Sequence, residues 1–382
     1  MLFNGSQKDF LYSVAILVGT IVGVGIFGIP FSFAKAGFIT GFLFLVFLGA
    51  VSLTINLIFG EVVLRTKEIH QFTGYAKKYL GPSARNFANF AWFAGIYGAL
   101  LAYIIISGNF IFNLLIPFFY FSPFFYSVLF FIFVSAALLA GLRQVAWFES
   151  FMIVFFVLII VLIFIFGLPR INIQNLITFG GGEFWFLPYG VLLFAYAGFS
   201  AVPLQRELAR RRPEILKKAI LWGSLLPIFL YFIFALTIVG VSGETTSPDV
   251  ISGLYDFFDY RIIFLVSLFG LFAITTSFLA LGSALLETFR IDHHFKRIRA
   301  WALVSFIPFL MFLFGVRNFI EVISVAGALA IGIEGIILVL MYKAAKKSSS
   351  REPEYSLNLP NWILNGLTFL FVLGAFYALF FE

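Results

Sequence analysis

The residues best suited to hold a ligand lie in two apolar stretches that glycine and proline interrupt. The first reads GTIVGVGIFGIP, from Gly19 to Pro30, and the second reads FAYAGFSAVP, from Phe194 to Pro203. Glycine lowers helix propensity and proline removes a backbone donor, so each stretch favours a local break in a helix. At a break, free N–H groups attract a carboxylate, and freed carbonyl groups attract an ammonium group or a metal cation. Two facing breaks would suit a zwitterion, whereas the alternative for the first stretch alone is close helix packing through small residues.

A third stretch supplies hydroxyl oxygens. It reads AITTS, and its last two residues, Thr276 and Ser277, share a helix face with the carbonyl group of Ala273. Together with two carbonyl groups from the first stretch, they predict a five-oxygen cage for a hard cation such as sodium, formed by Gly19, Val22, Ala273, Thr276 and Ser277. The alternative is that the two hydroxyl groups bond the carbonyl groups of the preceding helical turn.

The elements that carry these stretches are suited to a lipid bilayer. Of the 382 residues, 62% are hydrophobic and 11% are charged, whereas about a quarter of the residues in a soluble domain are charged. A helix crosses the hydrocarbon core with about 20 apolar residues. Continuous apolar runs favour helices over a barrel, and they predict eleven transmembrane helices, near residues 10–34, 38–64, 87–116, 122–141, 145–168, 185–204, 215–242, 260–287, 301–316, 319–342 and 360–381.

The basic residues predict the orientation of the chain in the membrane. If the N-terminus is cytoplasmic, 21 of the 25 lysine and arginine residues fall in cytoplasmic segments, as the positive-inside rule requires. We therefore expect a multi-pass protein of the cytoplasmic (inner) membrane, with the N-terminus inside and the C-terminus outside. The net charge of +7 is then a topology signal, so the expected partner is the lipid bilayer and not a nucleic acid.

The two interrupted stretches fall in the first and sixth predicted spans. Because these spans lie five apart, they cross the membrane in opposite directions, which is the arrangement of an inverted repeat. The sequence thus predicts an all-α integral membrane protein with a single transmembrane domain. Its first five-helix repeat covers residues 10–168, the second covers 185–342, and residues 359–382 form an additional C-terminal helix.

Four strings in this order resemble one known group of proteins: GTIVGVGIFGIPFSFAKAG, EVVLRTKEIHQFTGYAKKYLG, LPYGVLLFAYAGFSAVP and AITTSFLALGSALLE. From about residue 10 to 342, the chain resembles the amino acid/polyamine/organocation transporter superfamily. Within it, the hydroxy and aromatic amino acid permeases of the tryptophan/tyrosine permease type are the most similar branch. The resemblance implies a five-plus-five, leucine-transporter-type fold with discontinuous helices 1 and 6, and secondary uptake of an amino acid with a cation.

The resemblance also assigns residues to a substrate site. Matched by position, the carboxylate and amino groups of the substrate fall to Gly23, Val24, Gly25, Ile26, Phe27, Phe194, Ala195, Tyr196, Ala197, Gly198 and Ser200. The cation site of sodium-coupled members falls on the five cage residues named above. Some proton-coupled relatives fill that site with a lysine from span 5. Residues 145–168 contain no lysine, which leaves sodium open, although close relatives are usually regarded as proton symporters.

Two further side chains are candidates. Tyr97 is expected to line a side-chain pocket, with plain packing or lipid contact as the alternative in a chain that is 20% aromatic. Glu334 lies deep in the tenth predicted span beside Gly332 and Gly335, so we expect it to point into the bundle. An ionisable residue is expensive at that depth and marks a functional position. Glu334 either titrates during transport, as the proton-coupling group, or braces the bundle through a hydrogen bond.

The remaining composition argues against an enzyme. The chain has no cysteine, and its histidines, His70, His293 and His294, all fall in predicted loops without H-E-x-x-H spacing. We expect no cofactor apart from Na⁺ or H⁺ as the coupling ion, no transition metal and no obligate protein partner. The predicted function is secondary active import of an amino acid, of aromatic or hydroxy type, by symport with alternating access. The alternatives are an exchanger or a transporter-like amino acid sensor, and, less favoured, a membrane-embedded enzyme.

Overall fold

The computed structural model describes residues 5–141, 145–180, 182–210, 212–291 and 294–381. All regular secondary structure in these ranges is helical, as the sequence predicts. The α-helices are α1 (Gly5–Ile21), α2 (Gly25–Ala36), α3 (Phe38–Leu64), α4 (Phe72–Leu80), α5 (Pro82–Leu115), α6 (Pro123–Ala140), α7 (Val145–Gly167), α8 (Leu187–Ala195), α9 (Val202–Leu208), α10 (Leu216–Ser242), α11 (Tyr260–Ile291), α12 (Arg297–Leu313), α13 (Phe319–Val325), α14 (Gly332–Lys347) and α15 (Asn361–Phe381).

These helices account for the predicted spans. Within the described ranges, eight helical segments are long and apolar enough to cross a membrane, and α1 with α2 makes a ninth if the bent pair is one span. Helix α12, with 17 residues, and the apolar segment of residues 154–170, which joins the end of α7 to a 3-10 turn, fall just below that length. Each of the eleven predicted segments overlaps one helix or one interrupted pair. The all-helical, multi-span fold class is therefore confirmed, and the limits of the two repeats stay a prediction.

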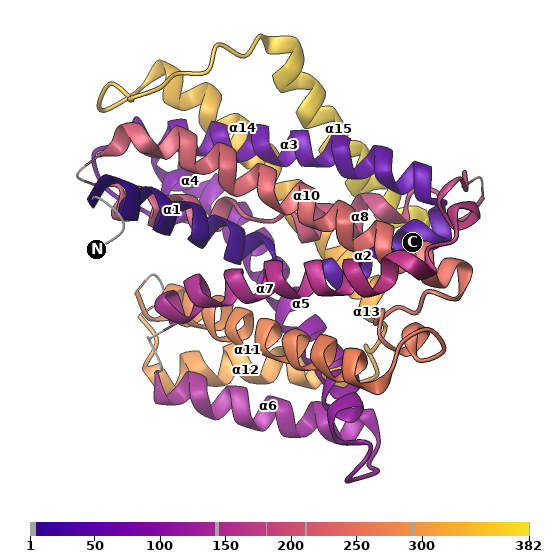
Figure 1. The fold of residues 1–382 in the computed structure, drawn as a ribbon. Helices are drawn as coiled ribbons and strands as arrows, with labels where there is room; N and C mark the ends of the chain where they lie inside the picture. The colour runs from indigo at the N-terminus through magenta and orange to yellow at the C-terminus, as the bar shows by residue number, and fades with distance from the viewer. Residues whose placement is uncertain (1–4, 142–144, 181, 211, 292–293, 382) are drawn as a thin grey trace.

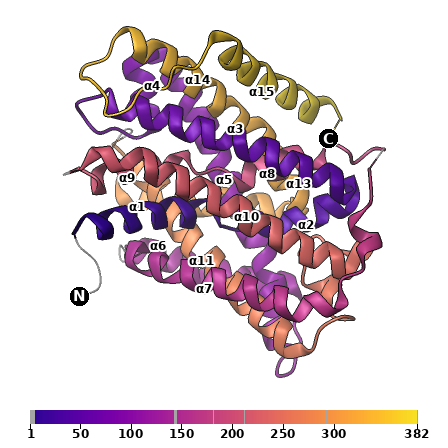
Figure 2. The same cartoon turned by 45° about the horizontal axis from the view of Figure 1, so that its top comes forward.

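The helices run side by side in a single bundle (Figure 1). Helix α1 begins at the end of the bundle where α4 also lies, and α15 finishes at the opposite end, as both ribbon views show (Figures 1 and 2). We call these the α4 end and the far end. Chain termini on opposite ends are what an odd number of crossings produces. Which end faces the cytoplasm stays a prediction from the loop charges.

The first span is broken where the sequence predicts it. Helices α1 and α2 meet at an angle of 53°, across residues 22–24. Gly25 starts α2 in close contact with α8, because a Cβ atom there would lie 2.6 Å from the Cα atom of Ala195. Real side chains do not approach a backbone atom so closely. The glycine therefore lets the two interrupted spans cross at their breaks.

The sixth span is broken as well. Helix α8 ends at Ala195, and a short 3-10 turn, η3 (Phe199–Ala201), leads into α9. Further on, a π-helical segment, η7 (Ala326–Ile331), separates α13 from α14. Such wide turns disturb the regular helix ladder and often occur at functional sites. The π-helical segment packs against α8 and α5, and the 3-10 turn packs against α1, α3 and α9.

The connection between α14 and α15 folds back onto the α4 end of α3. Glu61 of α3 is fully buried and forms an ion pair of 2.7 Å with Arg65. Its carboxylate also accepts hydrogen bonds from the Ser356 hydroxyl (3.1 Å) and from the backbone N–H of Leu357 (2.6 Å). Ser350 completes this contact by donating its backbone N–H to the carbonyl oxygen of Arg65. The connecting segment thus satisfies a carboxylate that would otherwise be buried with one partner.

Candidate binding site at the helix breaks

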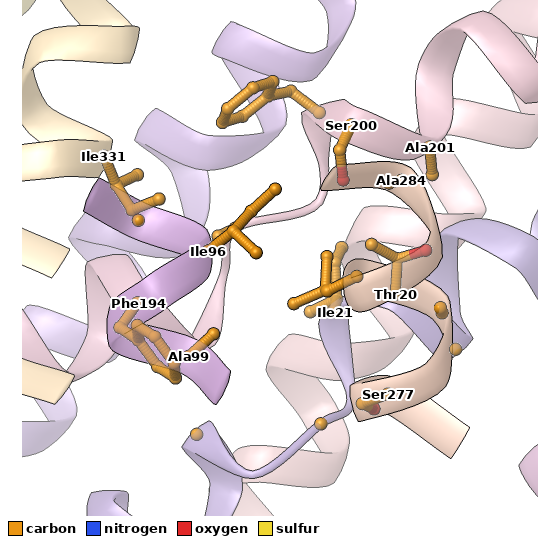
Figure 3. A pocket seen from close by; sticks show the side chains of 18 of the residues that line it. Thr20, Ile21, Ile96, Ala99, Phe194, Ser200, Ala201, Ser277, Ala284 and Ile331 are labelled. Atoms are coloured by element: carbon orange, nitrogen blue, oxygen red, sulfur yellow. The ribbon is translucent and has the colours of Figure 1, made fainter. Parts of the chain in front are cut away.

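A cavity of about 220 Å³ lies at the two helix breaks. Its walls come from α1 and α2, α5, the α8–α9 region, α11 and the start of α14. Figure 3 shows the side chains of Phe194 and Ile331 facing the same space as those of Thr20 and Ile21, with Ile96 between them. The broken backbone therefore lines a cavity, which is the setting in which irregular structure is tolerated at membrane depth.

The structure brings ten of the predicted site residues together around this cavity. They are Gly19, Gly23, Val24, Gly25, Phe194, Ala195, Ala197, Ser200, Ser277 and Glu334. Eight others are not part of its lining: Val22, Ile26, Phe27, Tyr97, Tyr196, Gly198, Ala273 and Thr276. The first group has the residue types of an amino acid site, namely exposed backbone at both breaks, small side chains and a few polar groups.

Three of the aromatic candidates point elsewhere. The Tyr97 hydroxyl donates to the carbonyl oxygen of Leu303 on α12, at 3.3 Å. The Tyr196 hydroxyl donates to the carbonyl oxygen of Leu45 on α3, at 3.2 Å. Phe27 is completely buried among other phenylalanines. In this conformation these rings pack between helices and do not touch the cavity.

One face of α5 contributes four side chains to the cavity, of which Tyr103 is a pocket candidate from the sequence and Trp92, Ile96 and Ala99 are not. Trp92, Ile96, Ala99 and Tyr103 all line the cavity. Their spacing of four, three and four residues is the spacing of one helix face. The signal was therefore present in the sequence, but it could not be separated from ordinary packing in a chain so rich in aromatic residues. Gln71, directly before α4, also lines the cavity, and no pattern indicated it.

A tyrosine from α10 joins the two breaks. The hydroxyl group of Tyr231 lies 2.6 Å from the carbonyl oxygen of Ile21 and 2.9 Å from that of Ala195. These two residues are the last of α1 and α8, so both carbonyl groups belong to helix ends without a following turn. Tyr231 is fully buried. It therefore satisfies freed backbone at both interruptions from a neighbouring helix.

One residue of the predicted cation cage, Ser277, lies at the first break. Its hydroxyl oxygen lies 3.6 Å from the position that a Cβ atom would take on Gly23, and the Tyr103 hydroxyl oxygen lies 3.8 Å from the same position. Helix α11 thus meets the first break directly. The Thr276 hydroxyl donates to the carbonyl oxygens of Ala273 (3.0 Å) and Phe272 (3.2 Å), as the packing alternative expects. A hydroxyl that donates its proton still has lone pairs for a cation, so these oxygens fit sodium in type.

Glu334 is the carboxylate of the cavity wall. It sits in the first turn of α14, is 1% exposed and lines the cavity. One of its oxygens, Oε2, has no hydrogen-bond partner among the described residues. A charge in such surroundings has to be compensated by a cation or removed by a proton. Glu334 is therefore a polar group with unused bonding capacity inside the site.

The cavity extends toward the α4 end and is closed toward the far end. Residues on the α4 side of the breaks, including Ile16, Gln71, Leu204 and Ala284, belong to its lining. On the other side, Phe27 packs against three rings from α5, α10 and α11, with centroid distances of 4.9, 6.0 and 6.3 Å to Phe110, Phe234 and Phe269. We call these four rings the aromatic plug. It separates the breaks from the far end of the bundle.

Ionisable groups lie near Gln71 in the chain, in and before α4. Lys78 donates a hydrogen bond to Glu68 and lowers the pKa of that carboxyl group. Burial lowers the pKa of the His70 imidazole, and the positive charge of Lys78 lowers it further. Since the usual histidine value is about 6.5, His70 is neutral at pH 7. The segment around Gln71 thus combines one ion pair with an uncharged imidazole.

Comparison with known proteins places the chain in a family. A model of the tryptophan/tyrosine permease family matches residues 6–380. Glutamine transporter 2 of Aliivibrio fischeri is 23% identical, covering 94% of this chain and 96% of that protein. The tyrosine-specific transport system 1 of Haemophilus influenzae is 25% identical, covering 94% and 93%. Both relatives are transporters and not enzymes, in agreement with the prediction from the sequence.

Solved structures share the fold. MhsT in complex with L-phenylalanine superposes with a TM-score of 0.70 at 15% identity, covering 97% of this chain and 98% of that one. The inward-facing conformation of Mhp1 gives a TM-score of 0.68 at 14% identity, covering 97% and 88%. These matches confirm the leucine-transporter-type fold with discontinuous helices 1 and 6. Since the family model matches nearly the whole chain, this multi-pass membrane protein belongs to the tryptophan/tyrosine permease family.

Proposed function

We propose that this protein imports an amino acid across the cytoplasmic membrane by symport with a cation, through alternating access. The observation that carries the proposal is a cavity at two helix breaks that is open toward the α4 end and closed by the aromatic plug. With the N-terminus inside, as the loop charges predict, this is an inward-facing state. Aromatic or hydroxy amino acids are the substrates that the family name and the tyrosine-specific relative suggest.

The breaks offer complementary charges to an amino acid. The start of α2, at Gly25, presents N–H groups and the positive end of a helix dipole to the substrate carboxylate. The ends of α1 and α8 present carbonyl oxygens and negative dipole ends to its amino group. Gly23, Val24 and Ala197, between these helix ends, leave room for the substrate backbone.

A sodium ion would be held by hydroxyl and carbonyl oxygens of α1 and α11. The five residues in this role are Gly19, Val22, Ala273, Thr276 and Ser277. The ion would supply positive charge beside the first break and so hold α1 against α11. Coupling then follows because substrate and ion each stabilise the arrangement of α1 that the other needs, and such an effect is reciprocal.

Uptake into proteoliposomes tests the proposal. The purified chain is reconstituted, a labelled amino acid mixture is added outside, and a sodium gradient or a proton gradient is imposed. Accumulation above the external concentration with one gradient would establish symport and identify the ion. Uptake only into vesicles preloaded with amino acid would indicate an exchanger instead. High-affinity binding without any uptake would indicate a sensor.

A double substitution tests whether the five cage residues bind sodium. In Thr276→Ala with Ser277→Ala, we expect the sodium concentration for half-maximal uptake to rise about tenfold or more, because two oxygen ligands are lost. Thr288→Ala is the matched control, since Thr288 lies on the same helix and donates its hydroxyl to the carbonyl of Ala284 in the same way. Equal sodium dependence in the double variant and the control would rule out the cage.

A proton-driven protein would need a titrating group, and Glu334 is the candidate. Glu334→Gln keeps the shape of the side chain but cannot bind a proton. We expect the variant to lose accumulation against a gradient and to retain exchange. An unchanged pH profile of uptake in this variant would exclude Glu334 from coupling.

A further inference from the structure

We propose that Glu334 recognises the side chain of the substrate, and that the site therefore selects amino acids whose side chain carries a hydrogen-bond donor. A phenol hydroxyl, an indole N–H and a side-chain amide all belong to this class. The inference rests on the proposed function, because it takes the cavity at the breaks as the amino acid site. It adds the feature by which that site distinguishes one amino acid from another.

The position of Glu334 within the cavity is the first support. Gly95 of α5 faces it, and a Cβ atom on Gly95 would lie 3.9 Å from Oε1 of Glu334. Glycine at this position places no side chain between α5 and Oε1. Ile96 and Ile331 lie beside it on the same wall. A substrate anchored at the breaks by its amino and carboxylate groups would direct its side chain into this partly apolar space.

The bonding state of Glu334 is the second support. In the described part of the chain, no residue donates a hydrogen bond to Oε2, and no lysine or arginine forms an ion pair with either oxygen. A residue that braced the bundle would have a partner in a neighbouring helix. A buried acceptor without a donor costs free energy, and a substrate donor removes that cost. The acceptor is available in both protonation states, since a protonated carboxyl group keeps one carbonyl oxygen.

Three other polar groups of the cavity wall are the hydroxyl groups of Thr20, Tyr103 and Ser277. The Thr20 hydroxyl donates to the carbonyl oxygen of Ile16, at 2.8 Å. The Tyr103 and Ser277 hydroxyl oxygens lie beside the first break, 3.8 and 3.6 Å from the position that a Cβ atom would take on Gly23. Glu334 differs from these three residues because its acceptor is buried and has no partner. It is therefore the group of this wall that a side-chain donor would satisfy.

A π-helical segment directly before α14 sets the direction in which Glu334 points. The π-helical segment η7 ends at Ile331, three residues before Glu334. A π turn inserts one extra residue and so rotates everything that follows by about 100° around the helix axis. Gly327 lies in η7 against the backbone of α8, where a side chain would overlap the carbonyl oxygen of Gly190. This contact with the broken sixth span fixes the rotation and directs Glu334 toward the site.

Competition between matched amino acid pairs tests the inference. The pairs are tyrosine with phenylalanine and glutamine with methionine, which differ in a side-chain donor at similar size. For the unchanged protein, we expect the donor-bearing member to compete about tenfold or more strongly, because a site built for a hydrogen bond discriminates against an analogue that lacks it. No difference within either pair would overturn the proposal.

Two substitutions separate recognition from proton coupling. Glu334→Leu removes the acceptor, and we expect both ratios to fall below about threefold. Glu334→Gln keeps an acceptor oxygen but cannot titrate, so we expect the ratios to persist even if proton-driven accumulation is lost. Retained discrimination in Glu334→Leu would overturn the proposal. Gly95→Ala is a mild alternative if Glu334→Leu does not fold, because its methyl group fits at ordinary contact distances and partly covers the carboxyl group; unchanged ratios in this variant would count against the proposal.

The same competition is measured as ligand-induced thermal stabilisation of the protein in detergent. This readout needs binding and not transport. If uptake fails but the paired amino acids still stabilise the protein in the expected order, the import function is wrong and side-chain recognition stands. If uptake occurs without discrimination in either assay, import stands and the role of Glu334 is wrong.

Discussion

At the scale of single residues, the hydroxyl group of Tyr231 has one proton and two carbonyl acceptors, at 2.6 and 2.9 Å. Only one of the two can receive a full hydrogen bond at a time, so the proton is shared between the ends of α1 and α8. The two breaks are therefore linked by one atom. A change at either break alters the bond that is available to the other.

Tyr231→Phe removes this link and little else. We expect a loss of about 1–3 kcal/mol in the free energy of unfolding, because the buried Ala195 carbonyl loses its hydroxyl donor and the Ile21 carbonyl keeps only the backbone N–H of Gly23. We also expect weaker substrate binding, since the breaks are no longer held together. Thermal unfolding and binding in detergent measure both effects. Tyr126→Phe is the control: its buried hydroxyl donates to a single carbonyl oxygen, that of Phe119. Equal effects of the two substitutions would contradict the role of Tyr231.

The positions of the two helix breaks could be predicted from the sequence, but the residues that contact them from distant parts of the chain could not. Glycine and proline act on the backbone where they stand, so the break near Gly23 and the one near Gly198 follow from local rules. Tyr231 lies 210 positions from Ile21. Nothing in its own sequence neighbourhood distinguishes it from the other tyrosines of an aromatic-rich chain. The same limit applies to Tyr97, whose hydroxyl faces α12 and not the cavity.

At the scale of helices, the crossing of α2 and α8 depends on the absence of a side chain. We expect Gly25→Ala to lower uptake at least tenfold and to cost about 1–3 kcal/mol of stability, because overpacking forces the backbones apart. Gly366→Ala in α15 is the control, since a Cβ atom there meets nothing within 4 Å. It should leave uptake unchanged and raise stability by about 0.5–1 kcal/mol. A fully active Gly25→Ala would show that the crossing is not needed.

The sequence predicted the membrane-spanning helices, but it did not predict the π-helical segment η7. Long apolar runs define spans by length and composition, so all eleven predicted segments correspond to helices. The π-helical segment AGALAI has the composition of an ordinary membrane helix. Its wide turn depends on the close contact of Gly327 with α8, which is a tertiary effect. The glycines around Glu334 predict that its side chain points into the bundle. Only the folded structure shows that Oε2 of Glu334 has no hydrogen-bond partner among the described residues.

At the scale of the whole molecule, the cavity and the aromatic plug make the two ends of the bundle unequal. The α4 end is open to the breaks, and the far end is closed. Because the sequence contains no cysteine, a single introduced cysteine reports access to one position. The loop charges and the cavity direction can thus be tested in one experiment.

We expect Ala284→Cys, in the cavity wall, to react with a membrane-impermeant maleimide in inside-out vesicles and to be protected in right-side-out vesicles. Glu244→Cys, in the exposed turn after α10, should show the opposite pattern. Labelling is measured by the mass of the modified protein. If Ala284→Cys reacted only from the outside, the orientation or the inward-facing state would be wrong.

The contact around Glu61 has a consequence for biosynthesis. Its partners Ser356 and Leu357 follow it by 295 and 296 residues, and a chain emerges from the ribosome starting at its N-terminus. Until residues 356 and 357 have been made, the carboxylate at the end of α3 has Arg65 as its near partner. A chain that stops before residue 356 therefore carries an incompletely paired buried charge into the membrane. The packing at the α4 end of α3 can therefore be completed only after residues 356 and 357 have been synthesised.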